Sequence, residues 1–503
     1  MPLPAWLIPL PDAVEQRALD AWAIEQHHIP GETLMERAGS ALARICAEVV
    51  PQGRIVVACG RGNNGGDGQV AARVLRQQRR DVTVIEVSQQ DPAVLGEAFH
   101  GAAGVIDALL GTGFAGAPRA PVLDAIRAIN AARAGEPGLR VIACDVPSGV
   151  DASTGEVASE AVGADVTVTF HAAKPGLWIA PGKRHSGKVR VVEIGMPRAD
   201  QPVMPRVGLI TPAVGDTVPR RSAASTKFSS GSVLVVGGSR GLTGAPTLAA
   251  LAAARAGAGY VTVAVPASVA PILAGKLLEV MTVELPDDPE TGPRRGSSRL
   301  AVERAGRAQA LVLGPGVGRL PAAQKFARDV AAHAGVALVL DADGLTAHAE
   351  EGGLESLAAR GAPTLLTPHA GELGRLLGVP SDEIDRHRLA HARAAAARAR
   401  AIVVLKGDDT IVAEPDGRVA ISPGGAPALA TAGTGDVLAG VLGAFLAKGL
   451  EPFTAACAAV STHLTAGQLA AEAIGVDGVM AGDVIAALPR ARAAAPPPGP
   501  EEG

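Results

Sequence analysis

A glycine-rich turn at residues 431–436 carries the residue types that could support phosphate chemistry. Its sequence is Thr-Ala-Gly-Thr-Gly-Asp, and an apolar stretch follows at once. Where such a turn opens a helix, backbone N–H groups and the positive end of the helix dipole point to one place, which suits phosphate oxygens. Asp436 would lie in the first helical turn, where a carboxylate could take or give a proton. Taken alone, the pattern is equally consistent with an ordinary glycine-rich loop.

Four other polar segments of the same half each follow a short apolar run that predicts a strand. They are Gly314-Pro315-Gly316-Val317-Gly318, Asp341-Ala342-Asp343-Gly344, Thr367-Pro368-His369-Ala370-Gly371-Glu372 and Lys406-Gly407-Asp408-Asp409-Thr410. In an open parallel sheet, ligands bind beyond the carboxyl ends of the strands. Singly, each segment could be a helix cap or a solvated turn. Together with Asp436 they predict a nucleotide-phosphate site.

The first half has a glycine-rich segment of its own at residues 60–68, directly after an apolar run at 54–59. It reads Gly-Arg-Gly-Asn-Asn-Gly-Gly-Asp-Gly, which differs from a plain dinucleotide-binding GxGxxG because asparagines and an aspartate stand between the glycines. Amide and carbonyl oxygens suit a hard cation, and backbone N–H groups suit a phosphate. The alternative is a ligand-free turn rich in left-handed residues.

Two further strand ends of the first half carry polar residues. The run 105–107 leads into 109–114, and the run 141–145 leads into Val-Pro-Ser-Gly at 146–149. We therefore expect Asn64, Asp107, Asp145 and Ser148 to meet at one edge of a sheet. A lone aspartate at a strand end is usually a turn former, but three glycine-rich strand ends with polar residues favour a site.

The alternation of apolar runs and helical spacings predicts an α/β architecture in both halves. The first half predicts helices at 12–26, 32–50 and 69–80, and strands at 54–59, 82–87, 105–107, 141–145, 165–170 and 188–194. The second half predicts strands at 232–236, 260–265, 310–313, 337–340, 364–366 and 402–405, a hairpin at 410–413 and 418–422, and helices at 245–256, 322–333 and 381–399.

Prolines at 197, 202, 205, 212 and 219 interrupt this pattern between the two halves. They predict domains at 1–214 and 223–490, joined by a linker at 215–222. The final segment, 491–503, is rich in alanine and proline and predicts a disordered tail. A chain of 503 residues is long enough for two or three domains.

Composition argues against several functional classes. Aromatic residues make up 2% of the chain and the net charge is −4, which disfavours nucleic-acid binding. The four cysteines are scattered without a CxxC pair, so zinc sites and disulfides are not expected. The first residues lack the pattern of a signal peptide, and no apolar run reaches transmembrane length. We expect a cytoplasmic protein with small-molecule partners and no membrane association.

Specific motifs give the chain a family resemblance over about residues 11–490. The first half resembles the NAD(P)H-hydrate epimerases through residues 63–68, 107–113 and 145–149. The second half resembles the ADP/ATP-dependent NAD(P)H-hydrate dehydratases, relatives of the ribokinase fold, through residues 314–318, 367–372, 406–407 and 430–436. The resemblance implies a Rossmann-like three-layer domain followed by a ribokinase-like α/β domain, as in the bacterial bifunctional repair enzymes.

For the first half, the resemblance implies a site that interconverts the R and S hydrates of NADH and NADPH. Asp145 would contact the substrate and act as acid or base. Potassium would be held by Asn64, Asp107 and Ser148. The remaining substrate-binding residues would be Asn63, Asn64, Gly65, Gly66, Asp67, Gly111, Thr112, Gly113, Phe114, Ala115, Gly116 and Ala117.

For the second half, the resemblance implies nucleotide-dependent dehydration of the S hydrate, with release of AMP and phosphate. Gly318, His369 and Asp436 would contact the hydrate, and Asp436 would be catalytic. The donor would be ADP, with ATP as the alternative, accompanied by Mg²⁺, and the protein would be a homo-oligomer. The nucleotide would be bound by Lys406, Gly407, Asp408, Asp409, Thr410 and Gly435. Residues 423–429 depart from the Asn-Pro-Gly-Met-like sequence usual in the family.

Two other hypotheses fit parts of the sequence. The turn at 433–436 also occurs in small-molecule kinases of the ribokinase type, for which the first half would be a nucleotide-binding regulatory domain. Such kinases lack the segment at 63–68, which distinguishes the two readings. Alternatively, the first half could only bind nucleotide or a protein partner. The presence of Asp107 and Asp145 argues against that non-enzymatic role.

Overall fold

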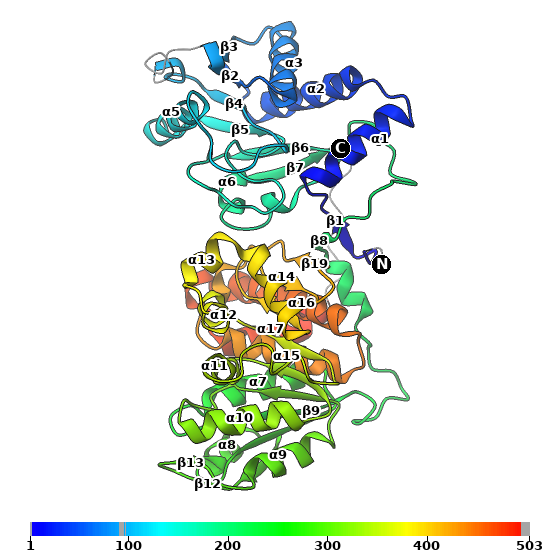
Figure 1. The fold of residues 1–503 in the computed structure, drawn as a ribbon, viewed down its shortest axis with the longest axis vertical. Helices are drawn as coiled ribbons and strands as arrows, with labels where there is room; N and C mark the ends of the chain where they lie inside the picture. The colour runs from blue at the N-terminus through cyan, green and yellow to red at the C-terminus, as the bar shows by residue number, and fades with distance from the viewer. Residues whose placement is uncertain (1–2, 90–94, 96, 494–503) are drawn as a thin grey trace. The chain divides into compact units, whose positions relative to one another are not determined.

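The computed structural model describes residues 3–89, 95 and 97–493, and the chain forms two compact units (Figure 1). The first unit consists mainly of Pro9–Gly208. The second consists of Pro4–Ile8 together with the chain from Leu209 onward. Most of the predicted tail lies outside the described residues, and residues 491–493 belong to the last helix, α17 (Ala481–Ala493). Among the described helices, none has the length and apolar character needed to cross a membrane.

The first unit is built on a parallel sheet with the strand order β3-β2-β4-β5-β6-β7. The chain runs outward from β2 in both directions, so the topological switch point lies between β2 and β4. The strands are β2 (Ile55–Cys59), β3 (Val82–Glu86), β4 (Gly104–Ala108), β5 (Arg140–Cys144), β6 (Val166–Phe170) and β7 (Lys188–Val192); the helices are α1 (Ala13–Glu25), α2 (Gly31–Val49), α3 (Asn63–Gln77), α5 (Val122–Gly135) and α6 (Lys183–Ser186).

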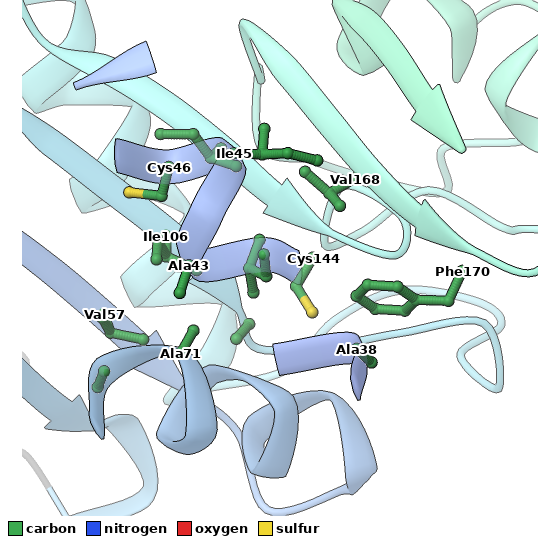
Figure 2. Packing of buried hydrophobic residues seen from close by; sticks show 14 of the residues in the cluster. Ala38, Ala43, Ile45, Cys46, Val57, Ala71, Ile106, Cys144, Val168 and Phe170 are labelled. Carbon is green, nitrogen blue, oxygen red and sulfur yellow. The ribbon is translucent and has the colours of Figure 1, made fainter. Parts of the chain in front are cut away.

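Alternate residues of these strands pack into two different cores, one on each face of the sheet. On β2, Ile55 and Val57 join a core with α2 and α3, whereas Val56 and Ala58 join a core with α5. This division follows from the two-residue period of a strand buried on both faces. Figure 2 shows part of the first core, to which strand residue Val57 and the helix residue Ala71 both belong. The expected Rossmann-like three-layer arrangement is confirmed.

One local prediction in this unit is wrong. The segment at 60–68 was expected to be a loop with a helix from residue 69, but α3 already begins at Asn63. The helix can start this close to β2 because of a glycine. A Cβ atom at Gly65 would lie 2.0 Å from the carbonyl oxygen of Gly60. The asparagines and Asp67 are therefore held on a helix rather than on a free loop.

The second unit has a mostly parallel sheet with the order β1-β8-β19-β18-β17-β16-β15-β14-β9-β10-β11. Strands β14 to β17 are parallel on one side of β9, and β10 and β11 on the other, so the switch point lies between β9 and β14. The strands are β1 (Leu7–Pro9), β8 (Val207–Ile210), β9 (Ser232–Val236), β10 (Tyr260–Pro266), β11 (Met281–Leu285), β14 (Ala310–Leu313), β15 (Ala337–Leu340), β16 (Thr364–Leu366), β17 (Ile402–Leu405), β18 (Ile411–Ala413) and β19 (Val419–Ile421).

The helices of this unit follow the strands in the alternation that the sequence predicts. A short hairpin, β12 (Asp287–Asp288) with β13 (Gly292–Pro293), stands apart from the main sheet. The helices are α7 (Gly244–Arg255), α8 (Ala270–Lys276), α9 (Ser297–Ala305), α10 (Pro321–His333), α11 (Asp343–Glu350), α12 (Ala370–Leu377), α13 (Ser381–Arg386), α14 (Arg388–Ala399), α15 (Thr434–Ala447), α16 (Pro452–Ile474) and α17. The hairpin predicted at 410–422 is confirmed as β18 and β19, which pair antiparallel.

The helix expected at 381–399 is two helices. His387 has φ −129° and ψ 46°, outside the helical range, and separates α13 from α14. The next residue, Arg388, is buried and its guanidinium pairs with Asp409 at 2.9 Å. This ion pair compensates a guanidinium that would be costly to bury unpaired.

The edge strands β1 and β8 were not expected from the sequence. β8 occupies residues that precede the predicted linker, and β1 comes from the extreme N-terminal region. Trp6, next to β1, packs its ring 6.2 Å from that of Phe453 on α16. The amide and hydroxyl of Thr211 both donate to the carbonyl of Trp6. The second unit is thus completed by two segments that are distant in sequence.

Candidate active sites

The first unit contains a cavity of about 830 Å³ at the carboxyl ends of its strands. The cavity opens at the switch point between β2 and β4, where ligands bind in sheets of this kind. The residues after β2, β4 and β5 line it, as the sequence predicts, and so do residues of α1 that the sequence analysis missed. Predicted site residues on its wall are Asn63, Asn64, Asp67, Gly111, Thr112, Gly113, Phe114 and Asp145.

Asp145 lies at the end of β5 with a backbone φ of +64°, a left-handed conformation that is unusual for a residue other than glycine. Its carboxylate is held by Lys174, whose Nζ lies 2.6 Å from Oδ1, and by hydroxyl donors from Thr112 and Thr169. Burial opposes ionisation, but the charge and hydrogen bond of Lys174 outweigh it, and the pKa of Asp145 is lowered. The cavity therefore presents an ionised carboxylate.

Lys174 is the main functional residue that the sequence analysis missed. It is 1% exposed, lines the cavity, and donates to Thr169 Oγ1 at 2.9 Å and to the carbonyl of Phe170 at 3.2 Å as well as to Asp145. A fully buried lysine is rare unless it is paired. The available signal was its position, because Lys174 follows the run at 165–170 just as the other site residues follow their strands.

Hydrogen bonds connect the three predicted potassium ligands, of which Asn64 also lines the cavity. Ser148 donates to Asp107 through its amide at 2.8 Å and its hydroxyl at 2.6 Å, and Asn64 Nδ2 donates to the carbonyl of Leu110 at 3.0 Å. The amide of Leu110 in turn donates to Ser148 Oγ at 2.9 Å. Asp107 is fully buried, and burial raises its pKa to about 6 although Ser148 lowers it. Ser148 thus contacts the buried carboxyl of Asp107 directly, and Asn64 is linked to them through the backbone of Leu110.

The rest of the predicted substrate segments lie around this cavity or support it. Gly65 and Gly66 are in the first turns of α3, where Met35 of α2 packs against Gly66. Ala115, Gly116 and Ala117 continue the loop that begins at Gly111, and Gly116 has φ +85°. These five residues are not among those that line the cavity.

In the second unit, Lys406 is the centre of a cluster of carboxyl groups. Its Nζ lies 3.1 Å from Asp341 Oδ1 and 3.6 Å from Glu372 Oε2. An ideal Cβ on Gly435 would lie 3.4 Å from the same Nζ, so Lys406 reaches the start of α15. The predicted residues after β17 and in the glycine-rich turn are therefore brought together. Asp341 and Glu372 join them from β15 and α12.

Asp436 lies in the first turn of α15, as the sequence predicts. Burial raises the pKa of its carboxyl to about 7, with Asp341 adding to the effect and Lys406 opposing it. Lys406 is shared with Asp341 and Glu372, so it compensates Asp436 only in part. A carboxyl with a pKa near 7 is suited to accept and return a proton at neutral pH.

His369 is fixed by the helix that it precedes, and Gly318 by the first residue of α11. His369 caps α12: its Nδ1 accepts from the amide of Gly371 at 3.0 Å, which places any proton of the neutral ring on Nε2. Burial lowers the pKa of His369 although Glu372 raises it. The amide of Gly318 donates to Asp343 Oδ2 at 2.9 Å, at the start of α11.

An ion pair and several hydrogen bonds hold the loop 406–410 in place. The carboxylate of Asp409 pairs with Arg388, which also donates to the carbonyl of Lys406 at 3.2 Å. Thr410 Oγ1 donates to the carbonyl of Gly407 at 2.7 Å, and Asp408 Oδ1 accepts from the amide of Gly425 at 2.7 Å. Asp409 is thus buried inside the loop and Asp408 ties it to residues 423–429. Asp409 would therefore affect nucleotide binding through the conformation of this loop and not by direct contact.

Comparison with known proteins covers both units. A family model described as NAD(P)H-hydrate dehydratase matches residues 233–490. A second, described as YjeF-related protein N-terminus, matches residues 31–100 and 86–176. The chain is 38% identical over 513 residues to the bifunctional NAD(P)H-hydrate repair enzyme of Moorella thermoacetica, with 95% of each chain covered. It is also 38% identical over 537 residues to that of Salinibacter ruber, with 96% of each covered.

A solved structure of the ADP/ATP-dependent NAD(P)H-hydrate dehydratase from Bacillus subtilis, co-crystallized with ATP and Mg²⁺, is 30% identical to the matched part. The match covers 55% of this chain and 94% of that one, with a TM-score of 0.48.

Proposed function

Because this chain belongs to the family of bifunctional NAD(P)H-hydrate repair enzymes, we propose that its two strand-end sites carry out the two steps of that repair. In such a hydrate, water has added to the dihydronicotinamide ring and left a hydroxyl on the carbon next to the ring nitrogen. The first unit would interconvert the R and S forms. The second would remove the hydroxyl from the S form with the help of a nucleotide.

One observation carries both assignments. Each unit places a lysine against carboxyl groups at the carboxyl ends of parallel strands: the buried Lys174 lies against Asp145, and the partly buried Lys406 lies against the buried Asp341. Buried charges of this kind cost stability unless they are paired, and they are typical of sites that perform proton transfer. Membership of the family suggests a reaction for each pair: epimerisation in the first unit and dehydration in the second.

In the first unit, the substrate would lie in the cavity lined by Asn63, Thr112 and Asp145. Asp145 is ionised and would accept a proton at the ring hydroxyl or from water. Lys174 would hold its carboxylate in place through the 2.6 Å hydrogen bond and would stabilise its charge. The left-handed backbone of Asp145 aims this side chain from the end of β5.

The residues around Asp107 fit potassium. The donor set of Asn64, Asp107 and Ser148 offers only oxygen ligands, which disfavours zinc and suits a hard monovalent cation. Asp107 is fully buried, and its hydrogen-bond donors among the described residues are neutral, so a cation would compensate its charge. Bound there, potassium would fix the loops after β4 and β5, which carry Thr112 and Asp145.

In the second unit, Asp436 would take the proton of the substrate hydroxyl as that oxygen attacks the terminal phosphoryl group of the nucleotide. The resulting phosphate ester turns a poor leaving group into a good one. The backbone N–H groups at Gly433 and Gly435, at the start of α15, would stabilise the charge on the transferring group. Gly318 and His369 would contact the hydrate.

Lys406, Gly407, Asp408 and Thr410 would hold the nucleotide, which we propose to be ADP, giving AMP and phosphate, with ATP as the alternative. The described residues contain no cluster of three or more acidic, histidine or cysteine side chains placed to hold a metal. Mg²⁺ would therefore be bound largely through the nucleotide phosphates, as is usual for this ion. A cytoplasmic location and a homo-oligomeric state remain predictions from the sequence.

The proposal is tested by incubating the full-length protein with separated R and S hydrates of NADH and of NADPH. We expect S hydrate plus ADP to regain the absorbance of NADH, and R hydrate to do so after a lag. Parallel reactions with ATP measure the nucleotide preference. Interconversion without nucleotide, followed by chromatography, isolates the first step. If neither hydrate changes under any of these conditions, the proposed function is wrong.

A further inference from the structure

Besides Asp145, two carboxyl residues line the cavity of the first unit: Asp20, which accepts a hydrogen bond from Gln16, and Asp67, which takes no part in the step described above. Asp67 is the fifth residue of α3 and is 9% exposed. It lines the cavity together with Asp145. Within the described residues, no hydrogen bond reaches its carboxyl group. It therefore neither caps the helix nor ties α3 to a neighbouring element.

The environments of Asp67 and Asp145 are opposite. Asp145 has Lys174 and two threonine hydroxyls on its oxygens, whereas Asp67 has none of these. Burial raises the pKa of Asp67 to about 8, and the negative charges of Asp145 and Asp20 add to this while Lys174 opposes it. Helix α2, which packs on this part of α3, contributes the uncharged Met35 and Gly39. At neutral pH one cavity thus holds a protonated and an ionised carboxyl.

Pairs of groups whose pKa values are pushed apart in this way identify the acid and the base of a site. Interconversion of R and S hydrates has a matching requirement. The hydroxyl must leave one face of the ring carbon and return to the other, so protons are needed on both faces. A single acid/base residue serves only one face.

We propose that Asp67 is the acid of the first site and works on the ring face opposite Asp145. This inference rests on the proposed epimerase function and adds the route by which the configuration inverts. Contact of Asp67 with substrate is expected from the family resemblance, but the role of acid comes from the shared cavity and the unpartnered carboxyl.

The step balances as follows. The bond between the ring carbon and the hydroxyl oxygen breaks, its electrons leave with the oxygen, and the oxygen takes the proton of Asp67 to depart as water. The lone pair of the ring nitrogen forms a double bond to the carbon. Water then attacks the other face, the nitrogen recovers its lone pair, and the carboxylate of Asp145 takes the proton. Exchange with solvent returns a proton to Asp67 and removes the proton from Asp145, so both groups regain their starting forms.

Oxygen exchange tests this route directly. Epimerisation of R hydrate by the full-length enzyme in water enriched with ¹⁸O should place one ¹⁸O in each molecule of S hydrate formed, measured by mass spectrometry and corrected for exchange without enzyme. The other route to inversion opens the ring by breaking the carbon–nitrogen bond. That route can keep the original oxygen, and S hydrate formed with its oxygen retained would overturn the inference.

Substitution tests the residue. Asp67→Asn keeps the size of the side chain but has no proton to give, so epimerisation should fall about 10²-fold or more. In the wild type, kcat/KM for epimerisation should fall as pH rises above about 8, because Asp67 loses its proton. The variant Asp67→Glu, which keeps a carboxyl group, should recover part of the rate lost in Asp67→Asn. Hydrate affinity by calorimetry and the thermal melt should change little in Asp67→Asn, which separates the role of acid from binding or folding.

The outcomes distinguish this inference from the proposed function. A wild-type protein that does not interconvert R and S hydrates overturns both. Wild-type interconversion with an unaltered rate and pH profile in Asp67→Asn overturns the role of Asp67 alone. Loss of hydrate affinity equal to the loss of rate assigns Asp67 to binding and also overturns its role as acid.

Discussion

The two units differ in how a lysine controls the ionisation of a nearby carboxyl group. Each places a lysine among carboxyl groups at the carboxyl ends of parallel strands, and this lysine is buried in the first unit and partly buried in the second. Lys174 is committed to one carboxylate and lowers the pKa of Asp145, whereas Lys406 is shared by Asp341 and Glu372 and leaves the pKa of Asp436 at about 7. The same pair of residue types thus gives a stable anion in one unit and a titrating base in the other. How the positive charge is divided decides which chemistry each site can perform.

Removing the carboxyl of Asp436 should have the largest effect. Asp436→Asn keeps the start of α15 but removes the base, so NADH recovery from S hydrate and ADP should fall about 10²–10⁴-fold. Nucleotide affinity should stay within about tenfold, because the backbone amides of the turn remain. Epimerisation, followed by chromatography, should be unchanged because that site lies in the other unit. Near-normal NADH recovery would remove Asp436 from catalysis.

Removing the ion pair between Lys174 and Asp145 in the first unit should affect both stability and activity. Lys174→Met leaves Asp145 buried without its partner, which costs roughly 3–5 kcal/mol of unfolding free energy and abolishes most epimerisation. In the double variant Lys174→Met with Asp145→Asn, the uncompensated charge is gone. Denaturant melts should then show most of the stability restored, with epimerisation still absent. A single variant as stable as the wild type would contradict the described pairing.

The pH profiles should separate the two units. Asp436 must be ionised to act as a base, so kcat/KM for dehydration should rise with pH up to a limb near 7. The pKa of Asp145 is lowered, so the corresponding acid limb of epimerisation should lie below the usual range of a carboxyl. Initial rates of both reactions across pH 5 to 8 measure the difference. Acid limbs at one common pH would break the comparison between the units.

The smallest expected effect concerns potassium. Asp107→Asn keeps the shape of the site but removes its charge, so potassium affinity should fall about tenfold or more. In the wild type, the thermal shift produced by potassium should weaken below about pH 6, where Asp107 becomes protonated. Epimerisation should fall with the loss of the ion while dehydration is unaffected. A variant with the full potassium-induced shift would contradict the assignment.

The sequence predicts most of this arrangement because strand ends are easy to find and because parallel sheets bring them to one edge. Asp107, Asp145, Lys406 and Asp436 all lie at the ends of apolar runs or in glycine-rich turns. Lys174 was missed although it occupies the same kind of position, since a lysine before a proline also suits an exposed turn. Its burial can be explained only once the fold shows that Lys174 pairs with Asp145.

Other features depend on contacts that no local pattern records. The early start of α3 at Asn63 requires the close approach of Gly65 to Gly60. The break at His387 lies next to Arg388, which pairs with a residue 21 positions later in the chain. β8 joins the second sheet from a segment whose prolines suggested irregular chain, and β1 joins it from an N-terminal segment in which no strand was expected. In each case tertiary contacts override the local signal.

The most direct test of two independent sites is complementation between variants. Asp145→Asn should convert S hydrate to NADH in the presence of ADP but leave R hydrate, whereas Asp436→Asn should interconvert R and S without forming NADH. Mixing the two purified variants with R hydrate and ADP should restore NADH formation to a rate near that of the wild type, because the S hydrate diffuses between them. A mixture that forms NADH no faster than Asp145→Asn alone would contradict the assignment of one step to each unit.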